Sequence, residues 1–312
     1  MNKEEYQELR SLITLVTRTR EDYQDLRKNL DNRIGRKADG TPTKTAEGRA
    51  LRPKDLEELC SLSDETRKQE EAAEAYLGRL VERMPIYPWL AEQRGVSTVA
   101  IGHICGAFDI YKADTVSKMW QYAGLNPGMV KGWVMEEDPK TKKKTKVRTN
   151  TMIRGDRRTA GFLSPFNGNL RTALIGVMAP CIVKSGLRWV PCTQETYDSL
   201  PEDMRDVRDK KIDGKMCKDT LCAMEINSPH VQRYIDKKRQ YVHSQQPIPH
   251  SAKKELWCTT SKGHRNNAAI RYMVKLFVAD LYNAWRPLHG LSVRAPYNEE
   301  KLGHTYSKSR AA

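Results

Sequence analysis

Apolar residues recur at steps of three and four along the first thirty residues of the chain, which is the spacing of one helix face. The seam consists of Tyr6, Leu9, Ile13, Val16, Tyr23 and Leu30. Arg20 and Arg27 interrupt it where a heptad pattern would place apolar side chains. The pattern predicts one long helix. That helix must stop near Gly35, because residues 35–48 hold Gly, Pro and Thr without an apolar period and predict a turn or loop.

A second helical stretch is predicted at about 53–83. Its apolar side consists of Leu56, Leu59, Leu62, Ala73, Tyr76 and Leu80. Packing is the expected use of such a stripe, rather than ligand binding. Residues 1–85 are therefore predicted to form a helical arm. The arm is either an antiparallel helical pair within one chain or a coiled coil that joins chains into a homo-oligomer.

Two prolines and a tryptophan at Pro85, Pro88 and Trp89 predict a boundary, because proline removes a backbone donor and restricts the residue before it. We expect a second domain at 86–290 and a C-terminal tail at 291–312. The second domain begins with a pattern of helix, glycine turn and helix, with the turn at Gly95-Val96-Ser97. Such a helix-hairpin-helix can present N–H groups to a phosphate. Any tight turn between helices also uses glycine, so the pattern leaves a purely structural role open.

The charge of the chain indicates a polyanionic partner. Its 312 residues hold 54 Lys and Arg against 39 Asp and Glu, a formal net charge of +15, so nucleic acid is the expected partner. Residues 131–158 alone hold ten basic residues against four acidic ones and are predicted as a basic loop, with a flexible run at Lys142-Lys143-Lys144. A charge run is often only a solvated surface, but the charge of the whole chain favours phosphate contact.

Downstream of the basic loop, residues 163–179 predict a turn that leads into an apolar helix. Ser164 is a candidate N-cap with Pro165 following, and a later start at Asn167 or Asn169 is the alternative. Residues 180–260 are predicted as an irregular insertion. A buried core helix is predicted at 266–285, and the basic stretch that ends at Arg265 precedes it as a further candidate phosphate seat.

Several other classes of protein are disfavoured. No run of 18 apolar residues and no apolar signal core is present, and the seven cysteines are scattered and odd in number, so we expect a cytoplasmic protein with reduced thiols. Cys192, Cys217, Cys222 and His230 have a looser spacing than true zinc knuckles. No Walker loop or dinucleotide fingerprint is present either. We therefore expect no metal and no cofactor.

The order of several short strings resembles a known family. It runs from the Gly95 hairpin to Trp120-Gln-Tyr-Ala-Gly-Leu-Asn-Pro127, then to 157–179 and then to the helix at 268–286. This order is similar to the C-terminal domain of the Piv-like DNA invertases and DEDD insertion-sequence transposases. The Tyr-Ala-Gly-Leu-x-Pro string is the most specific piece. The N-terminal helices, with Arg18, Arg20 and Leu26, resemble the coiled coil that precedes that domain, so the resemblance covers roughly residues 10–290.

Two departures from the family bear on activity. The family begins with a RuvC-like nuclease domain whose four acidic residues hold metal ions, and we expect no such domain here, because the acids of 1–85 lie on predicted helices. The family's serine nucleophile follows the Gly-Leu-x-Pro string in a Ser-Gly pair, where this chain has Lys131-Gly132. A lysine cannot form a phosphoserine. Ser164 is better explained as a cap, and Ser185 is a remote substitute without an identifiable activating partner.

We therefore expect a mainly α protein with an N-terminal helical arm and a helix-hairpin-helix domain of the transposase type, which binds DNA or structured RNA through backbone contacts. The expected contact residues are Gly95, Ser97, Lys131, Lys142, Lys143, Lys144, Arg157, Arg158 and Arg265. The expected role is DNA binding in mobile-element or phage recombination without nuclease activity of its own. The alternatives are an active recombinase subunit completed by a separately encoded RuvC-like nuclease, and an oligomerising structural protein whose charge only keeps it soluble.

Overall fold

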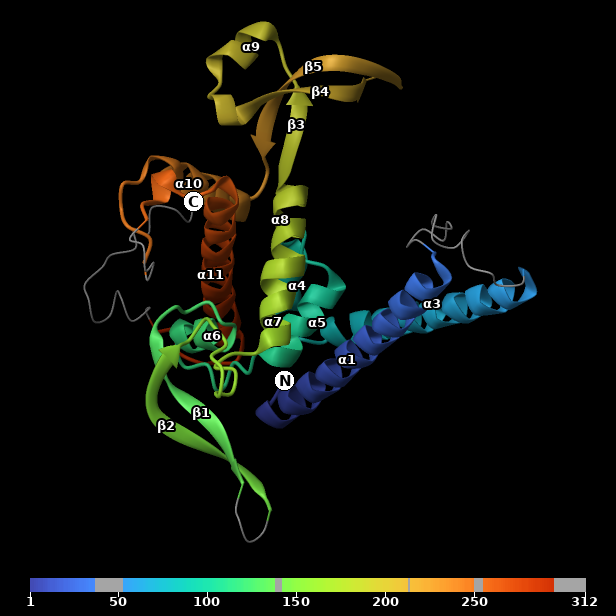
Figure 1. The fold of residues 1–312 in the computed structure, drawn as a ribbon, viewed down its shortest axis with the longest axis vertical. Coiled ribbons are helices and arrows are strands. Elements are labelled where there is room, and N and C mark those ends of the chain that lie inside the picture. The colour runs from blue at the N-terminus through green and yellow to red at the C-terminus, as the bar shows by residue number, and fades with distance from the viewer. Residues whose placement is uncertain (37–52, 138–141, 213, 250–254, 295–312) are drawn as a thin grey trace. The chain divides into compact units, whose positions relative to one another are not determined.

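The computed structural model describes residues 1–36, 53–137, 142–212, 214–249 and 255–294 (Figure 1). This part of the chain is mostly helical and also contains two small antiparallel sheets, so the expected mainly α class is confirmed. The chain divides into two compact units. Unit 1 comprises Met1–Leu90, Ser97–Lys112 and Leu288–Leu291, and unit 2 comprises Ala91–Val96, Ala113–Pro287 and Ser292–Ala312. No helix within the described ranges is both long and apolar enough to cross a bilayer.

Unit 1 is built on two long helices that lie side by side in Figure 1, α1 (Lys3–Ile34) and α3 (Pro53–Val81). A capping box starts α1, because Asn2 and Glu5 each bind the other's backbone N–H. Gly35 ends α1 in the left-handed conformation, with φ of 74°. The predicted long helix and its stop are therefore confirmed. Most of the predicted loop after Gly35 lies outside the described residues.

The two helices run antiparallel and meet through charged groups in the half of α1 beyond Val16. Glu70 of α3 binds Arg20 at 2.9 Å and Arg27 at 2.7 Å, and the Ser63 hydroxyl donates to Asp31 at 2.6 Å. The arginines that interrupt the apolar seam are thus neutralised by the facing helix. A buried guanidinium is stable only with such a partner.

The predicted apolar stripe of α3 requires correction. Leu62 and Tyr76 are 53% and 41% exposed, while Ser63, Thr66 and Glu70 face inward together with Leu77 and Leu80. The physical reason is the pair of arginines on α1, since the helix opposite them must turn carboxylate and hydroxyl groups toward the interface.

Two shorter helices follow, α4 (Tyr87–Glu92) and α5 (Thr98–Ala107), joined by the predicted turn at 95–97. Helix α5 packs closely on the long pair. A Cβ at Gly102 would lie 2.8 Å from a methyl group of Leu77, and a Cβ at Gly106 would lie 2.9 Å from the hydroxyl of Thr14. Because α5 belongs to unit 1, the division of the chain differs from the predicted boundary after residue 85.

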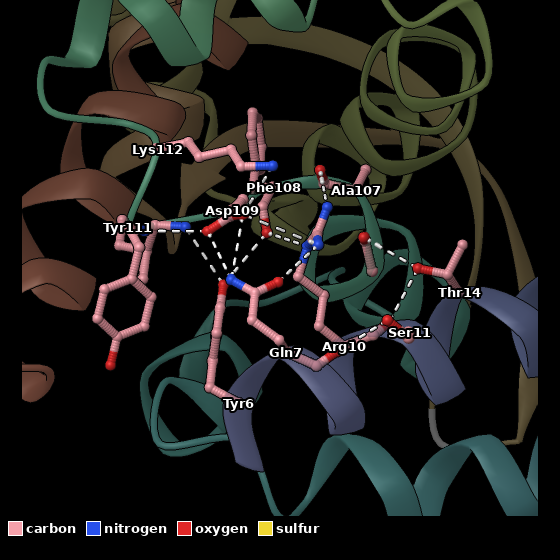
Figure 2. Close-up of polar contacts among 12 residues, drawn as sticks. Tyr6, Gln7, Arg10, Ser11, Thr14, Ala107, Phe108, Asp109, Tyr111 and Lys112 are labelled. Carbon is pink, nitrogen blue, oxygen red and sulfur yellow. Dashed lines mark hydrogen bonds and ion pairs between the residues drawn. The ribbon is translucent and has the colours of Figure 1, made fainter. Parts of the chain in front are cut away.

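A polar network joins the start of α1 to the segment after α5, as Figure 2 shows. The carboxylate of Asp109 is buried, accepts a hydrogen bond from Gln7 at 3.2 Å and lies 3.9 Å from Arg10. The Tyr6 hydroxyl donates to the carbonyl of Phe108 at 3.3 Å, and burial raises the pKa of that hydroxyl. These contacts hold the segment after α5 against the first turns of α1.

Unit 2 contains two sheets and the remaining helices. In chain order its elements are α6 (Val116–Tyr122), β1 (Met129–Glu137), β2 (Lys144–Arg154), α7 (Gly168–Arg171), the π-helix η1 (Thr172–Met178), α8 (Ala179–Gly186), β3 (Leu187–Pro191), α9 (Gln194–Ser199), η2 (Glu202–Met204), β4 (Arg205–Ile212), β5 (Lys215–Ile226), α10 (Pro229–His243), η3 (Trp257–Thr259) and α11 (Lys262–Leu288). Helix α11 carries the core of this unit, as predicted. Its buried side chains include Ala269, Met273, Val274, Phe277, Val278, Leu281, Tyr282 and Trp285.

Two predictions for unit 2 were wrong. The basic loop at 131–158 is mostly an antiparallel hairpin of β1 and β2, because Thr145, Val147, Thr149 and Thr151 alternate with polar residues, which favours a strand. The irregular insertion at 180–260 contains α8, α10 and a sheet of order β3-β5-β4. Its strands are largely exposed and carry many charges, so no clear apolar alternation marks them.

The start of α7 follows the later of the two predicted positions. Asn167 is the N-cap, and its side chain accepts a hydrogen bond from the N–H of Leu170 at 3.1 Å. Ser164 is not the cap. Its hydroxyl donates instead to the carbonyl of Phe166 at 2.8 Å.

Replacing Glu70 tests the charged interface of unit 1. Glu70→Gln should lower the free energy of unfolding by about 3 kcal/mol at neutral pH, since it leaves Arg20 and Arg27 without their shared carboxylate. Burial raises the pKa of Glu70, but the hydrogen bond from Arg27 and the charges of both arginines outweigh burial and place the pKa below its ordinary value. The difference in the free energy of unfolding between wild type and variant should therefore have its full size at pH values above the ordinary pKa of a glutamate. It should decrease as the pH falls through the lowered pKa of Glu70.

Urea unfolding followed by circular dichroism, repeated at decreasing pH, measures this difference. Glu74→Gln is the matched control, because Glu74 also binds Arg20 but its side chain is 42% exposed. It should cost less than about 1 kcal/mol. An equal decrease in stability in both variants would contradict a special role for the buried carboxylate.

Candidate nucleic-acid interface

The Tyr-Ala-Gly-Leu-Asn-Pro string ends helix α6 in a tight turn. Gly124 has a φ of 67°, its N–H donates to the carbonyl of Gln121 at 3.1 Å, and the N–H of Leu125 donates to the carbonyl of Trp120 at 2.8 Å. This is the Schellman pattern of helix ends, in which glycine adopts the left-handed conformation. The Tyr-Ala-Gly-Leu-Asn-Pro string therefore has a structural role in this chain.

The same turn positions the segment before α7. A Cβ at Gly124 would lie 2.8 Å from the ring of Phe166 and 3.1 Å from Cδ of Arg171. The N–H of Asn167 donates to the carbonyl of Tyr122 at 2.8 Å. The Arg171 guanidinium lies 4.8 Å from the centre of the Phe166 ring. The absence of a side chain at Gly124 thus allows Arg171 to be held at the end of α6.

Helix α11 joins this arrangement through Trp120. The indole N–H donates to the carbonyl of Lys275 at 2.8 Å, and the Lys275 ammonium lies 4.3 Å from the ring centre. Burial lowers the pKa of Lys275. The segments 120–127, 157–179 and 268–286 therefore pack together in unit 2.

The β1–β2 hairpin carries its cations on one face. Residues directly opposite one another in an antiparallel pair point to the same side of the sheet. The register pairs Trp133 with Arg148, Met135 with Lys146, Glu137 with Lys144, and Lys131 with Met152. Between these two pairs, Lys131 with Met152 and Trp133 with Arg148, β2 contains an even number of extra residues. The alternation of side chains between the two sides of the hairpin therefore continues through the register shift. All of these side chains therefore share one side of the hairpin.

We call this side the cationic hairpin face and define it by Lys131, Trp133, Lys144, Lys146 and Arg148. The Lys146 ammonium and the Arg148 guanidinium lie 5.0 Å and 5.8 Å from the centre of the Trp133 ring. Its four basic side chains are exposed. Glu137 is the acidic residue of the two strands that faces this side, and it lies 3.9 Å from Lys144. The face is thus positively charged around an aromatic ring.

The base of the hairpin is anchored in unit 2. A Cβ at Gly132 would lie 2.4 Å from the Phe162 ring, so glycine is required by close packing there. The N–H of Leu163 donates to the carbonyl of Trp133 at 2.7 Å. Arg154 binds Asp156 through two contacts of 2.9 Å. Figure 1 shows the hairpin extending from this base beyond α6. The cationic face is therefore presented on a supported ribbon.

The structure brings together most of the predicted contact residues. Lys131, Lys142, Lys143 and Lys144 lie on or next to the hairpin, and Lys142 lies 4.0 Å from Glu137. Arg157 and Arg158 are exposed three and four residues after the end of β2. These cations therefore belong to one continuous segment.

Three other predicted residues have packing roles. A Cβ at Gly95 would lie 2.5 Å from the carbonyl oxygen of Cys181, so one side of this turn is closed by α8. The Ser97 hydroxyl caps α5 by accepting a hydrogen bond from Ala100 at 3.3 Å. The Arg265 guanidinium donates to three backbone carbonyls in and around η3. Close packing, helix capping and backbone hydrogen bonds account for these three positions.

Sequence reasoning missed the central members of the face, which are Trp133, Lys146 and Arg148. Lys146 and Arg148 contribute only to the charge count of the segment, because its composition predicts a loop. The signal that could have found them is the alternation in Lys144-Thr-Lys-Val-Arg-Thr-Asn150, with cations at every second position.

The catalytic candidates lack an activated nucleophile in this geometry. Lys131 is exposed on β1 and donates to the side chain of Asn150 at 3.1 Å. The hydroxyl of Ser185 donates to the carbonyl of Ile182 at 3.2 Å, and neither Ser185 nor Ser164 hydrogen-bonds a described histidine or carboxylate.

Acidic and zinc-type ligands are also dispersed. The buried carboxylates Asp31, Glu70, Asp109 and Asp156 each pair with an arginine. Within the described ranges, no three His, Cys, Asp or Glu side chains gather as metal ligands would. The buried acids serve instead as counter-ions for arginines.

Comparison of the chain with protein-family models, with curated proteins and with solved structures finds no match.

Two glycines test the role of the turn after α6. Gly124→Ala should lower the free energy of unfolding by about 2–3 kcal/mol, since it adds both left-handed strain and a clash with Phe166. Gly161→Ala is the matched control, because Gly161 also has a positive φ, of 80°, but has nothing within 4 Å of the added atom. It should cost about 1 kcal/mol. Urea unfolding measures both values, and equal costs would show that the contact with Phe166 is unimportant.

Proposed function

We propose that this protein is a DNA-binding relative of the Piv-like invertases and DEDD transposases, which acts in mobile-element or phage DNA recombination without cutting DNA by itself. The observation that carries the proposal is the cationic hairpin face, with four basic side chains on the same side of an exposed ribbon as Trp133.

The shape and charge of the hairpin suit a nucleic-acid duplex. A two-stranded β-ribbon fits the major groove of B-DNA, and ribbons are an established class of DNA reader. Residues 129–137 and 142–154 hold seven basic residues against two acidic ones. Such cations contact phosphates and release condensed counter-ions, which gives binding without sequence preference.

The family resemblance supports the same role for unit 2, as a helix-hairpin-helix domain of the transposase type. Three of the segments that carry the resemblance, 120–127, 157–179 and 268–286, pack around Gly124 and Trp120. Lys131 stands where the family has its serine nucleophile. The buried carboxylates pair with arginines, and the described residues contain no acidic cluster that could hold a metal ion. Both observations support a binding role rather than strand cleavage.

Removing two cations from the hairpin face tests the proposal. The double variant Lys146→Ala, Arg148→Ala should bind a duplex of about 30 base pairs at least about tenfold more weakly at about 0.15 M salt. Its plot of log affinity against log salt should be shallower by about 0.9 for each phosphate that the variant no longer neutralises. Fluorescence anisotropy with a labelled duplex across a salt series measures both quantities.

The matched control is Lys211→Ala, Lys215→Ala, which removes the same charge from the tip of the β4–β5 hairpin. We expect its affinity to change by less than about twofold. Equal weakening in both double variants would mean that only total charge matters. Negligible duplex binding by the wild type would overturn the proposal and favour the oligomerising structural protein.

A further inference from the structure

A second basic feature of unit 2 is a groove beside the π-helix. It has a volume of about 570 Å³ and lies between the α7–η1–α8 rod and α11, which run alongside each other in Figure 1. Its lining consists of Arg171, Thr172, Ile175, Gly176, Pro180, Asn267, Ile270 and Arg271. This volume is typical of sites for small molecules or single nucleotides and is too small for a duplex.

Two arginines from different elements line this groove. Arg171 donates to the carbonyl of Asp156, and Nε of Arg271 donates to the carbonyl of Asn267 at 3.2 Å. Neither forms an ion pair with a carboxylate in the described part of the chain, where Asp156 pairs with Arg154 instead. Burial lowers the pKa of Arg171, the charge of Asp156 opposes this, and the charge of Arg271 lowers it further. A bound anion would relieve this repulsion.

The remaining lining of the groove is partly apolar. Ile175 and Ile270 supply aliphatic surface, and Gly176 is exposed and carries no side chain. The groove runs along η1, and π-helical turns are frequent at functional sites. An anion-binding end beside an aliphatic wall matches the two parts of a nucleotide, its phosphate and its base.

An aromatic and cationic cluster lies where α10 and η3 meet α11. The ammonium of Lys237 lies 4.7 Å from the Tyr272 ring and 5.0 Å from the Tyr241 ring, and Tyr241 stacks on Trp257 at 4.0 Å. Tyr272 directly follows Arg271 in the sequence. Aromatic rings beside cations are the usual surface on which single-stranded nucleic acids lie.

From these observations we propose that the groove binds one unpaired nucleotide of a nucleic-acid strand, with its phosphodiester between Arg171 and Arg271 and its base against Ile175 and Ile270. Arginine suits this role because its planar fork can donate two hydrogen bonds to one phosphate. The inference rests on the proposed nucleic-acid function and adds a preference for single-stranded segments.

Arg271→Ala in the full chain tests the inference. Its affinity for a single-stranded thymidine oligonucleotide of about 12 nucleotides should fall about tenfold, with a salt slope shallower by about 0.7. Its affinity for a blunt duplex should stay within about twofold of wild type. Arg271→Lys keeps the charge but lacks the fork, and should recover only part of the affinity. Lys184→Ala is the control, because Lys184 is exposed on α8 but does not line the groove.

A second variant blocks the groove without removing an arginine. A Cβ at Gly176 would have its nearest neighbour at 3.7 Å, so Gly176→Glu should fold normally, as circular dichroism can verify. Its carboxylate would compete for the arginines and should weaken oligonucleotide binding at least as much as Arg271→Ala. Unchanged oligonucleotide binding in both variants would overturn the inference. The proposed function would still stand if the Lys146→Ala, Arg148→Ala variant binds duplex DNA more weakly than wild type.

Thymidine monophosphate tests nucleotide binding by the groove independently of binding to a nucleic-acid strand. If the wild type binds no nucleic acid, the proposed function fails, and binding of thymidine monophosphate followed by NMR then tests the groove directly. Shifts at Gly176 and Arg271 that disappear in Arg271→Ala would support the nucleotide site. The absence of such shifts, in a chain that also fails to bind the oligonucleotide, would overturn it.

Discussion

The left-handed turn at Gly124 is the constraint on which the arrangement of unit 2 depends. Its missing side chain leaves room for Phe166 and for the aliphatic part of Arg171, while Trp120 in the preceding helix binds the backbone of α11. Three segments far apart in the sequence meet there. The hairpin begins five residues after this glycine, and the groove begins at Arg171. Both proposed contact surfaces are therefore positioned by the same turn.

Charge compensation has the corresponding role in unit 1. Glu70 satisfies two arginines that break the apolar seam of α1, and Asp31 with Ser63 extends the polar contact. A buried network of this kind contributes less to stability than an apolar seam of the same size, but it penalises any register that leaves a charge without its partner. The helical pair is thus specified by polar matching as much as by apolar burial.

Sequence reasoning succeeded where one apolar period dominates. The long first helix, its stop at Gly35 and the core stripe of α11 follow directly from periodicity and glycine chemistry. Prediction from the sequence failed where a strand is exposed, because its alternating residues are then not apolar on either side. The strands β2, β4 and β5 have so many charged residues that composition suggests a loop, although β-branched residues alternate along β2. The inward face of α3 could not be predicted either, because it depends on Arg20 and Arg27 of the opposite helix. The groove could not be predicted because it forms between α11 and the π-helix, and no local sequence pattern shows that these two helices lie close together.

The alternation of the β1–β2 hairpin also limits how its length can change. Every second residue of β2 points to the same side, so inserting or deleting one residue within the strand would turn the cations beyond that point to the opposite side. The register shift opposite Gly132 already obeys this limit, because it adds an even number of residues. Natural variants of this ribbon that keep a single charged side should therefore differ in length by pairs of residues, with odd changes confined to the connection between the strands.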